Sequence, residues 1–315
     1  MTPPPPPSRL AIALAFAAVY VVWGSTYLAM RIGVGSLPPF LLGAIRFFLA
    51  GCAMWGYHAA KGKTHLARGH WRNTTIAGLL LLVGGNGGVV WAVQHIPSGL
   101  AALIVGTVPL WVVALAWATG ARRPSGRLVS GLGLGLVGIA VLLGPDVVTA
   151  FAHDQAPGTP ARAHALGVLA VLFASLSWAM GSLWSRRARV PEAPLLPTGM
   201  QMLAGGAALF LLSAVRGEMT TFSPAQVTSA ALLALAYLVV FGSLLAYSAY
   251  IWLLQVVPPA RVATYAFVNP VVAVFLGTAL AGEPLGTRTL VSAAIIVGAV
   301  ALITTAPADA PPQTR

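Results

Sequence analysis

Arg46 is the charged residue of this sequence whose surroundings most need explaining. It lies within an apolar stretch that begins at Pro39, and at about 1.5 Å per helical residue it falls about 10 Å from that end. If the stretch spans a bilayer, the charge costs roughly 2.5–3.5 kcal/mol even on insertion scales. Three arrangements would offset this cost: snorkelling to the interface, contacts with carbonyl groups of a neighbouring helix, or a place in a cavity where the guanidinium attracts a carboxylate or phosphate.

Further polar and aromatic side chains fall inside apolar stretches elsewhere in the chain. They are Trp23, Asn86, Trp178, Tyr247, Tyr265 and Asn269. Side chains that combine apolar faces with hydrogen-bonding groups suit a cavity for small organic molecules better than a bare ion pore. With Arg46 they form the set of candidate substrate-binding residues, although a residue of this kind taken alone is more often a packed, hydrogen-bonded one.

Two prolines occupy matching positions in their apolar stretches. Pro109 and Pro270 each lie about eleven residues from the start, which puts both about 16 Å deep in a bilayer core of ~30 Å. A proline inside a helix leaves the carbonyl four residues earlier, here Val105 or Ala266, without its helical partner. We predict a kink near the midplane in both stretches, either to expose polar backbone to a substrate or only to shape the packing.

Several kinds of chemistry have no support in the sequence. The six acidic residues fall in loops, at segment ends or in the tails, so a buried carboxylate relay is missing. No histidine lies near the middle of a segment, and the glycine runs lack the lysine and hydroxyl residue of a phosphate loop. The single cysteine, Cys52, allows neither an intramolecular disulfide nor a cysteine metal cluster. We therefore expect no enzymatic activity, no metal and no cofactor.

The elements that position these residues are membrane-spanning helices. Hydrophobic residues make up 58% of the chain and charged residues 8%, against roughly 25% charged residues in soluble domains. A spanning helix needs about 20 mainly apolar residues, so 315 residues accommodate ten. The predicted spans are Leu10–Met30, Pro39–Tyr57, Thr75–Val93, Ser98–Thr119, Leu128–Gly144, Leu166–Trp184, Leu196–Val215, Ser229–Leu254, Pro259–Ala281 and Thr289–Thr305.

The distribution of positive charge predicts the orientation of these spans. With both termini in the cytoplasm, thirteen of the 18 lysines and arginines lie on the cytoplasmic side and four outside, while Arg46 falls within a span. Cytoplasmic loops of membrane proteins carry the excess of such residues. The formal net charge of +12 is therefore explained by topology, and we expect no nucleic-acid partner.

An internal repeat divides the chain into two halves. Five identities occur at one constant offset of 161: Trp91 with Trp252, Gln94 with Gln255, Pro97 with Pro258, Ala102 with Ala263, and Pro109 with Pro270. Trp23 with Trp178 and Gly51 with Gly206 match at an offset of 155. Because each half has five spans, the second must cross the membrane in the opposite sense from the first. Inverted repeats are characteristic of secondary transporters that work by alternating access; a channel or a non-transporting scaffold is the alternative.

The repeat also sets the expected domain boundaries. We predict a Pro-rich tail at 1–9, a first repeat at 10–144, a periplasmic linker at 145–163, a second repeat at 164–305 and a tail at 306–315. Both tails have the composition of disordered segments.

Several motifs in this order resemble a known family. They are Trp23-Gly24-Ser25-Thr26, Arg46-Phe47, Pro97-Ser98-Gly99, Val268-Asn269-Pro270 and Gly282-Glu283. The chain is similar to EamA-type members of the drug/metabolite transporter superfamily, and among them to YedA-like exporters of bacterial inner membranes. One departure is that the first half has Thr119-Gly120-Ala121 where the second has Ala281-Gly282-Glu283, so the acidic residue is absent from one repeat.

The resemblance implies ten helices in two EamA repeats. It implies a cavity framed chiefly by the first, third, fourth, sixth, eighth and ninth helices, and export of amino acids, other small metabolites or drugs. The expected partners are a small-molecule substrate and the lipid bilayer, with a monomer and a homodimer both open.

Overall fold

The fold consists of helices that cross a membrane. The computed structural model describes residues 7–62, 64, 68–92, 95–96, 98–153, 161–188, 195–281 and 286–306. In these ranges, ten helical spans are long and apolar enough to cross a bilayer, which confirms the predicted all-α polytopic membrane protein. The tails at 1–6 and 307–315, Gln94, Pro97 and Glu283 lie outside the described residues.

The first five spans are built from ten helical segments. They are α1 (Arg9–Ala17), η1 (Ala18–Val22), α2 (Trp23–Gly33), α3 (Pro39–Ala60), α4 (Arg68–Gly78), η2 (Leu79–Gly87), α5 (Gly88–Ala92), α6 (Ser98–Val105), α7 (Val108–Ala118) and α8 (Gly126–His153). The third span therefore starts at the polar residues before Thr75, and α8 continues past Gly144 into the stretch expected to be a linker.

The last five spans follow the same plan. Their segments, with short connecting helices, are α9 (Ala161–Ser185), η3 (Arg186–Ala188), α10 (Leu196–Val215), α11 (Glu218–Thr221), η4 (Pro224–Gln226), α12 (Ser229–Tyr237), η5 (Leu238–Tyr247), α13 (Ser248–Val256), α14 (Pro259–Val262), α15 (Tyr265–Ala281) and α16 (Thr287–Thr305).

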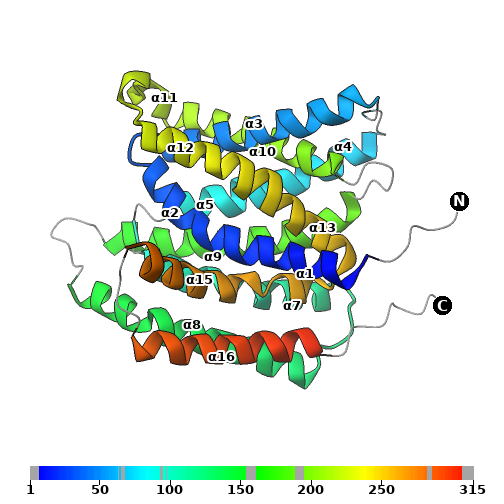
Figure 1. Cartoon of the computed structure of the whole chain (residues 1–315), viewed down its shortest axis with the longest axis vertical. Coiled ribbons are helices and arrows are strands. Elements are labelled where there is room, and N and C mark those ends of the chain that lie inside the picture. The colour runs from blue at the N-terminus through cyan, green and yellow to red at the C-terminus, as the bar shows by residue number, and fades with distance from the viewer. Residues whose placement is uncertain are drawn as a thin grey trace, which may run out of the picture.

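The spans stack in a row in which equivalent helices of the two halves meet. Figure 1 shows α3 beside α10 at one end of the row and α8 beside α16 at the other, with the remaining spans between them. The start of α1 and the end of α16 lie on the same side of the molecule, as an even number of spans requires. We refer to this side as the termini face; the charge distribution predicts that it is cytoplasmic.

Small residues allow the α3–α10 pair to pack closely. A Cβ added at Gly51 would lie 2.7 Å from the Leu203 backbone nitrogen, and one at Gly206 would lie 2.7 Å from that of Phe48. The two contacts are equivalent under the repeat, since 51 and 206 differ by the same 155 residues as 48 and 203. Small residues at helix interfaces let backbones approach within a bilayer, where van der Waals packing drives association. The repeat seen in the sequence is therefore also a repeat of contacts.

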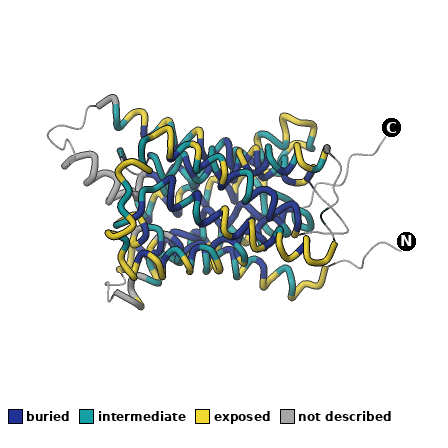
Figure 2. Tube along the Cα trace, turned by 90° about the horizontal axis from the view of Figure 1, so that it is seen from above, coloured by how far each residue is buried: buried dark blue, intermediate teal, exposed yellow. Residues whose placement is uncertain are grey.

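Burial follows the pattern expected of a membrane protein. Large apolar side chains such as Leu211, Leu233 and Val297 are exposed on the outside of the row, where they face lipid. Buried positions concentrate along its middle (Figure 2). The polar side chains singled out above lie in this interior, where the two halves meet.

Candidate functional site

A central cavity lies between the two repeats, and its empty space, including the part open to solvent, is about 750 Å³. Its lining consists of Trp23, Thr26, Met30, Arg46, Phe47, Gly85, Asn86, Val89, Val105, Val108, Ala174, Ser175, Trp178, Tyr247, Tyr265 and Asn269. The structure thus brings together all seven candidate residues predicted from the sequence. They come from the first, second, third, sixth, eighth and ninth spans. The fourth span contributes Val105 and Val108 to the lining.

Local widening of two helices shapes the cavity wall. The third and eighth spans each contain a π-helical segment, η2 and η5, at equivalent positions in the two repeats. Such segments are rare and occur frequently at functional sites. Asn86 lies near the end of η2 and Tyr247 at the end of η5, and the two are separated by the repeat offset of 161. Both widened turns therefore present a polar side chain to the same cavity.

A glycine in η2 lets an aromatic ring reach the cavity. A Cβ at Gly85 would lie 2.7 Å from Cε3 of Trp178, closer than real carbon contacts allow. The indole of Trp178 consequently occupies the space that a side chain on η2 would otherwise fill.

Arg46 faces the cavity, which is one of the three arrangements considered for it. Its side chain is 6% exposed, its Nε donates to Oγ of Ser243 at 2.8 Å, and its Cζ lies 4.7 Å from the centroid of the Phe47 ring. Gly242 makes room for it, because a Cβ there would lie 2.8 Å from the guanidinium. No acidic residue in the described ranges forms an ion pair with it. The cavity therefore contains a positive charge that has no carboxylate partner in the part of the chain that the structure describes.

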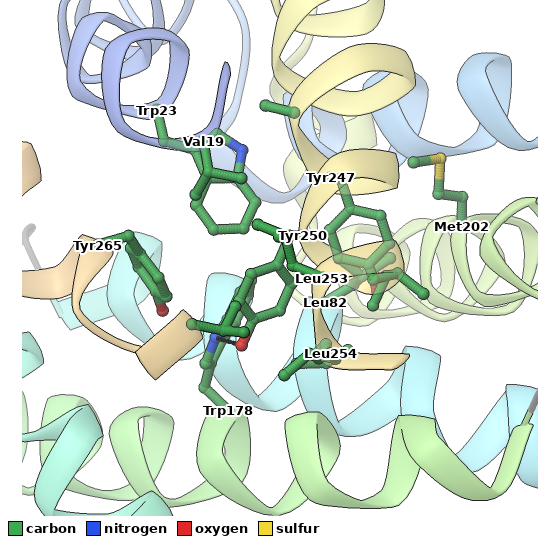
Figure 3. Packing of buried hydrophobic residues seen from close by; sticks show 14 of the residues in the cluster. Val19, Trp23, Leu82, Trp178, Met202, Tyr247, Tyr250, Leu253, Leu254 and Tyr265 are labelled. Atoms are coloured by element: carbon green, nitrogen blue, oxygen red, sulfur yellow. Dashed lines mark hydrogen bonds between the residues drawn. The ribbon is translucent and has the colours of Figure 1, made fainter. Parts of the chain in front are cut away.

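Trp23, Trp178, Tyr250 and Tyr265 form a cluster of four aromatic rings (Figure 3), and all but Tyr250 line the cavity. Trp23 contacts Trp178, Tyr250 and Tyr265 with ring centroids 5.0–5.7 Å apart, the range of favourable aromatic pairs. The two indole N–H groups are bound within the protein: Trp23 Nε1 donates to the Gly242 carbonyl at 3.1 Å, and Trp178 Nε1 donates to the Tyr250 hydroxyl at 2.9 Å. The cluster offers the cavity an apolar surface.

The remaining polar candidates differ in how free they are to meet a ligand. Asn86 is half-buried and has no hydrogen-bond partner among the described residues. Asn269 is buried, and its amide nitrogen is placed to donate to the main-chain carbonyls of Tyr20 at 3.3 Å and Tyr265 at 3.1 Å. The hydroxyl of Tyr247 donates to Oε1 of Gln201 at 2.8 Å. Asn86 and Arg46 are therefore the polar groups with the most capacity left for a ligand.

The two prolines do not act in the same way. The fourth span is interrupted at Gly106 and Thr107, and Pro109 lies in the first turn of α7, where a missing N–H disrupts nothing. Pro270 lies inside the continuous α15, and the ninth span is instead interrupted at Ala263 and Thr264. Both spans are therefore broken, but at different distances from their prolines, and a kink at each proline stays a prediction.

Nine lining residues were not among the sequence candidates. Most are small or apolar, and their types do not distinguish them from packing residues. Thr26 and Phe47 were nevertheless within reach, since each stands in a motif already singled out around Trp23 or Arg46. In the described part of the chain, no group of three or more His, Cys, Asp or Glu residues gathers as a metal site would require.

Comparison with known proteins identifies the family. The EamA-like transporter family matches residues 9–144 and again residues 165–305. The chain belongs to this family. The family is described as transporters, and several relatives are named inner membrane transporter, transporter or efflux pump. With its ten apolar spans, this chain is a multi-pass transporter of the inner membrane.

Two relatives illustrate the range of similarity. YedA of Escherichia coli (strain K12), named an uncharacterized inner membrane transporter, is 37% identical over 92% of this chain and 89% of its own. A probable amino-acid metabolite efflux pump of Salmonella typhimurium is 25% identical over 89% of this chain and 90% of its own. A solved crystal structure covers 94% of this transporter and 97% of its own chain with a TM-score of 0.74 at 23% identity, which shows the same fold.

Proposed function

We propose that this transporter exports small organic metabolites, such as amino acids or related compounds and drugs, by alternating access around the central cavity. The observation that carries the proposal is a cavity between inverted repeats that contains a guanidinium without an acidic partner among the described residues. The names of distant relatives, probable amino-acid metabolite efflux pumps, support the substrate class.

The guanidinium of Arg46 indicates that the proposed substrate carries an anionic group. An arginine within the bilayer is costly, and Ser243 and Phe47 offset only part of that cost. A carboxylate binds a guanidinium through two parallel hydrogen bonds and would neutralise the charge. Asn86 offers further hydrogen-bonding capacity, and the aromatic cluster suits the apolar part of the same molecule. Amino acids and related carboxylates combine these features.

The present state fits one half of a transport cycle. A smaller pocket of about 410 Å³ shares Arg46 and Asn86 with the cavity and continues to Val34 and Pro39, near the face opposite the termini. Towards the termini face, the Tyr20 hydroxyl and Thr264 Oγ1 lie 2.5 Å apart and join the two repeats. We infer that this state is open away from the termini, on the predicted periplasmic side.

The proposal is tested by efflux from proteoliposomes loaded with labelled amino acids, decarboxylated analogues and cationic dyes, with and without a pH gradient. Saturable efflux of a carboxylate is expected in the wild type. Arg46→Gln should raise its half-saturation concentration by roughly 30-fold, the equivalent of about 2 kcal/mol for a charged hydrogen bond. Arg216→Gln, which removes an exposed charge from a loop, is the matched control. Asn269→Ala tests whether the amide contributes beyond its main-chain contacts.

Two results would contradict the proposal. Flux that rises linearly with concentration would favour a channel, and the absence of saturable flux for every compound would favour a scaffold. Equal effects of Arg46→Gln on carboxylates and on their decarboxylated analogues would refute the role given to the guanidinium.

A further inference from the structure

The second repeat contains a counterpart of Arg46. Gln201 lies 155 residues after Arg46, the offset that also relates Trp23 to Trp178 and Gly51 to Gly206. The reciprocal backbone contacts of Gly51 and Gly206 show that α3 and α10 are equivalent at this register. Arg46 and Gln201 both lie early in their helices, and because the repeats are inverted, these helices start from opposite faces. Gln201 therefore lies towards the termini face.

The neighbours of the two residues are equivalent as well. Arg46 shares the cavity lining with Asn86, and Gln201 is hydrogen-bonded to Tyr247, which lies 161 residues after Asn86. One turn before Gln201 stands Thr198, the counterpart of Gly43, which lines the smaller pocket beside Arg46. The second repeat therefore repeats the wall of the open pocket with Thr198, Gln201 and Tyr247, but in a closed form.

The closed wall contains polar atoms that the protein does not satisfy. Thr198 and Gln201 are 1% and 0% exposed, and within the described ranges neither Thr198 Oγ1 nor Gln201 Nε2 has a hydrogen-bond partner. Buried polar groups in native proteins are almost always paired, and leaving them unpaired is destabilising. Because the two residues are three positions apart on α10, they face the same side of that helix. Packing alone does not account for both.

We propose that Thr198 and Gln201 line the substrate pathway when the transporter opens to the termini face. There they would take the places that Gly43 and Arg46 take in the present state. The amide N–H and the hydroxyl would then donate hydrogen bonds to acceptor oxygens of the substrate, such as a carboxylate. This inference rests on the proposed alternating access and adds a binding wall to it.

Cysteine accessibility tests the inference without a known substrate. Cys52 is the single cysteine of the chain, so Cys52→Ala gives a background in which Gln201→Cys, Thr198→Cys, Arg46→Cys or Ile303→Cys is the only thiol. Ile303 is the control near the termini face. It lies on α16, is 1% exposed and packs against α8. Each full-length variant is treated with a membrane-impermeant methanethiosulfonate reagent from either face of oriented vesicles.

The expected result is that Arg46→Cys reacts from the face opposite the termini, while Gln201→Cys and Thr198→Cys react from the termini face. Positions 198 and 201 should react at least about tenfold faster than Ile303→Cys. A minor state populated at roughly 0.1–10% exposes these two positions to the reagent but leaves position 303 packed. If Gln201→Cys fails to fold, Thr198→Cys carries the test.

The unfavourable outcomes are distinguishable. If Arg46→Cys reacts from both faces while positions 198 and 201 stay as slow as position 303, alternating access stands and the inference is wrong. If no position reacts from the termini face in any condition, the proposed function itself fails along with it.

Discussion

Trp23 and Trp178 occupy equivalent positions in the two repeats, and their rings meet edge to face with centroids 5.7 Å apart. Their hydrogen bonds break this symmetry, because both indoles donate to the eighth span, Trp23 to the Gly242 carbonyl and Trp178 to the Tyr250 hydroxyl. An exact two-fold arrangement would direct one of them to the third span. The hydrogen bonds of Trp23 and Trp178 therefore differ between the two states that the inverted repeats allow, and they identify the state seen in this structure.

Trp178→Phe isolates the hydrogen-bonding part of this contact. Phenylalanine keeps an aromatic ring but removes the donor to Tyr250, so we expect a loss of about 1 kcal/mol of stability. Trp178→Ala should cost more, about 3–5 kcal/mol, because it also leaves a cavity. Thermal unfolding in detergent measures both. Trp117→Phe, at an exposed site, is the matched control, and an equal loss there would show that the Tyr250 bond is irrelevant.

The α3–α10 interface predicts a sharp difference between two glycines. Gly206→Ala places a methyl group 2.7 Å from the Phe48 backbone nitrogen, whereas Gly56→Ala on α3 meets no neighbouring atom within 4 Å. We expect Gly206→Ala to destabilise the protein by about 1–3 kcal/mol through overpacking, and Gly56→Ala to be neutral or slightly stabilising because alanine favours helix. Thermal unfolding of both variants decides the matter. Equal melting temperatures for the two variants would contradict this prediction, because they would mean that α3 and α10 can move apart at little cost to accept the methyl group.

Much of this arrangement could be predicted from the sequence because bilayer physics is restrictive. Ten apolar stretches had to become ten helices, and residues such as Arg46 and Asn86, costly in lipid, had to face an interior. Seven of the lining residues could therefore be selected by type and depth, whereas Thr26 and Ser175, which are also polar, were not. The cavity's apolar members, such as Val105 and Ala174, could not be selected, because nothing in their type separates cavity walls from packing.

Other features depend on backbone detail that residue types do not encode. No proline or charge marks η2 and η5, so two regular spans were expected where the structure has wide turns. The positions of Pro109 and Pro270 were clear, but no residue type marked the helix breaks at Gly106–Thr107 and Ala263–Thr264. Gln201 was visible as a polar residue at the repeat offset from Arg46, and the contacts of α3 with α10 were needed to establish that equivalence.

Glu218 links the loop after the seventh span to the start of the second. Its carboxylate accepts hydrogen bonds from the backbone N–H groups of Phe40 and Leu41, at 3.3 and 3.0 Å, and from Ser213 Oγ at 2.8 Å. The first turn of a helix favours a negative charge and an acceptor for its free N–H groups. Glu218→Gln should therefore cost about 1 kcal/mol in thermal unfolding experiments. Ser213→Ala, which keeps the charge, should cost less, and the reverse order would contradict the capping role.

The bond between Tyr20 and Thr264 predicts how the balance between the two states can be shifted. Along their spans, both residues lie nearer the termini face than the cavity residues Trp23 and Tyr265, so their bond closes that side. Tyr20→Phe removes it, and a loss of about 1 kcal/mol shifts the equilibrium roughly fivefold towards opening at the termini face. We expect thiol labelling of Arg46→Cys from the opposite face to fall and labelling of Gln201→Cys from the termini face to rise.

Tyr237→Phe is the control for this shift, because it removes a similar hydroxyl bond, to Ser25 Oγ at 2.6 Å, in a different part of the structure. Ser25 follows Trp23 on α2 and lies beyond it from the termini face, so losing this bond does not open that face. Labelling of Gln201→Cys from the termini face should consequently be unchanged by Tyr237→Phe. If both variants raise that rate equally, the lost bonds loosen the protein in general, and the Tyr20–Thr264 contact has no specific part in closing the termini face.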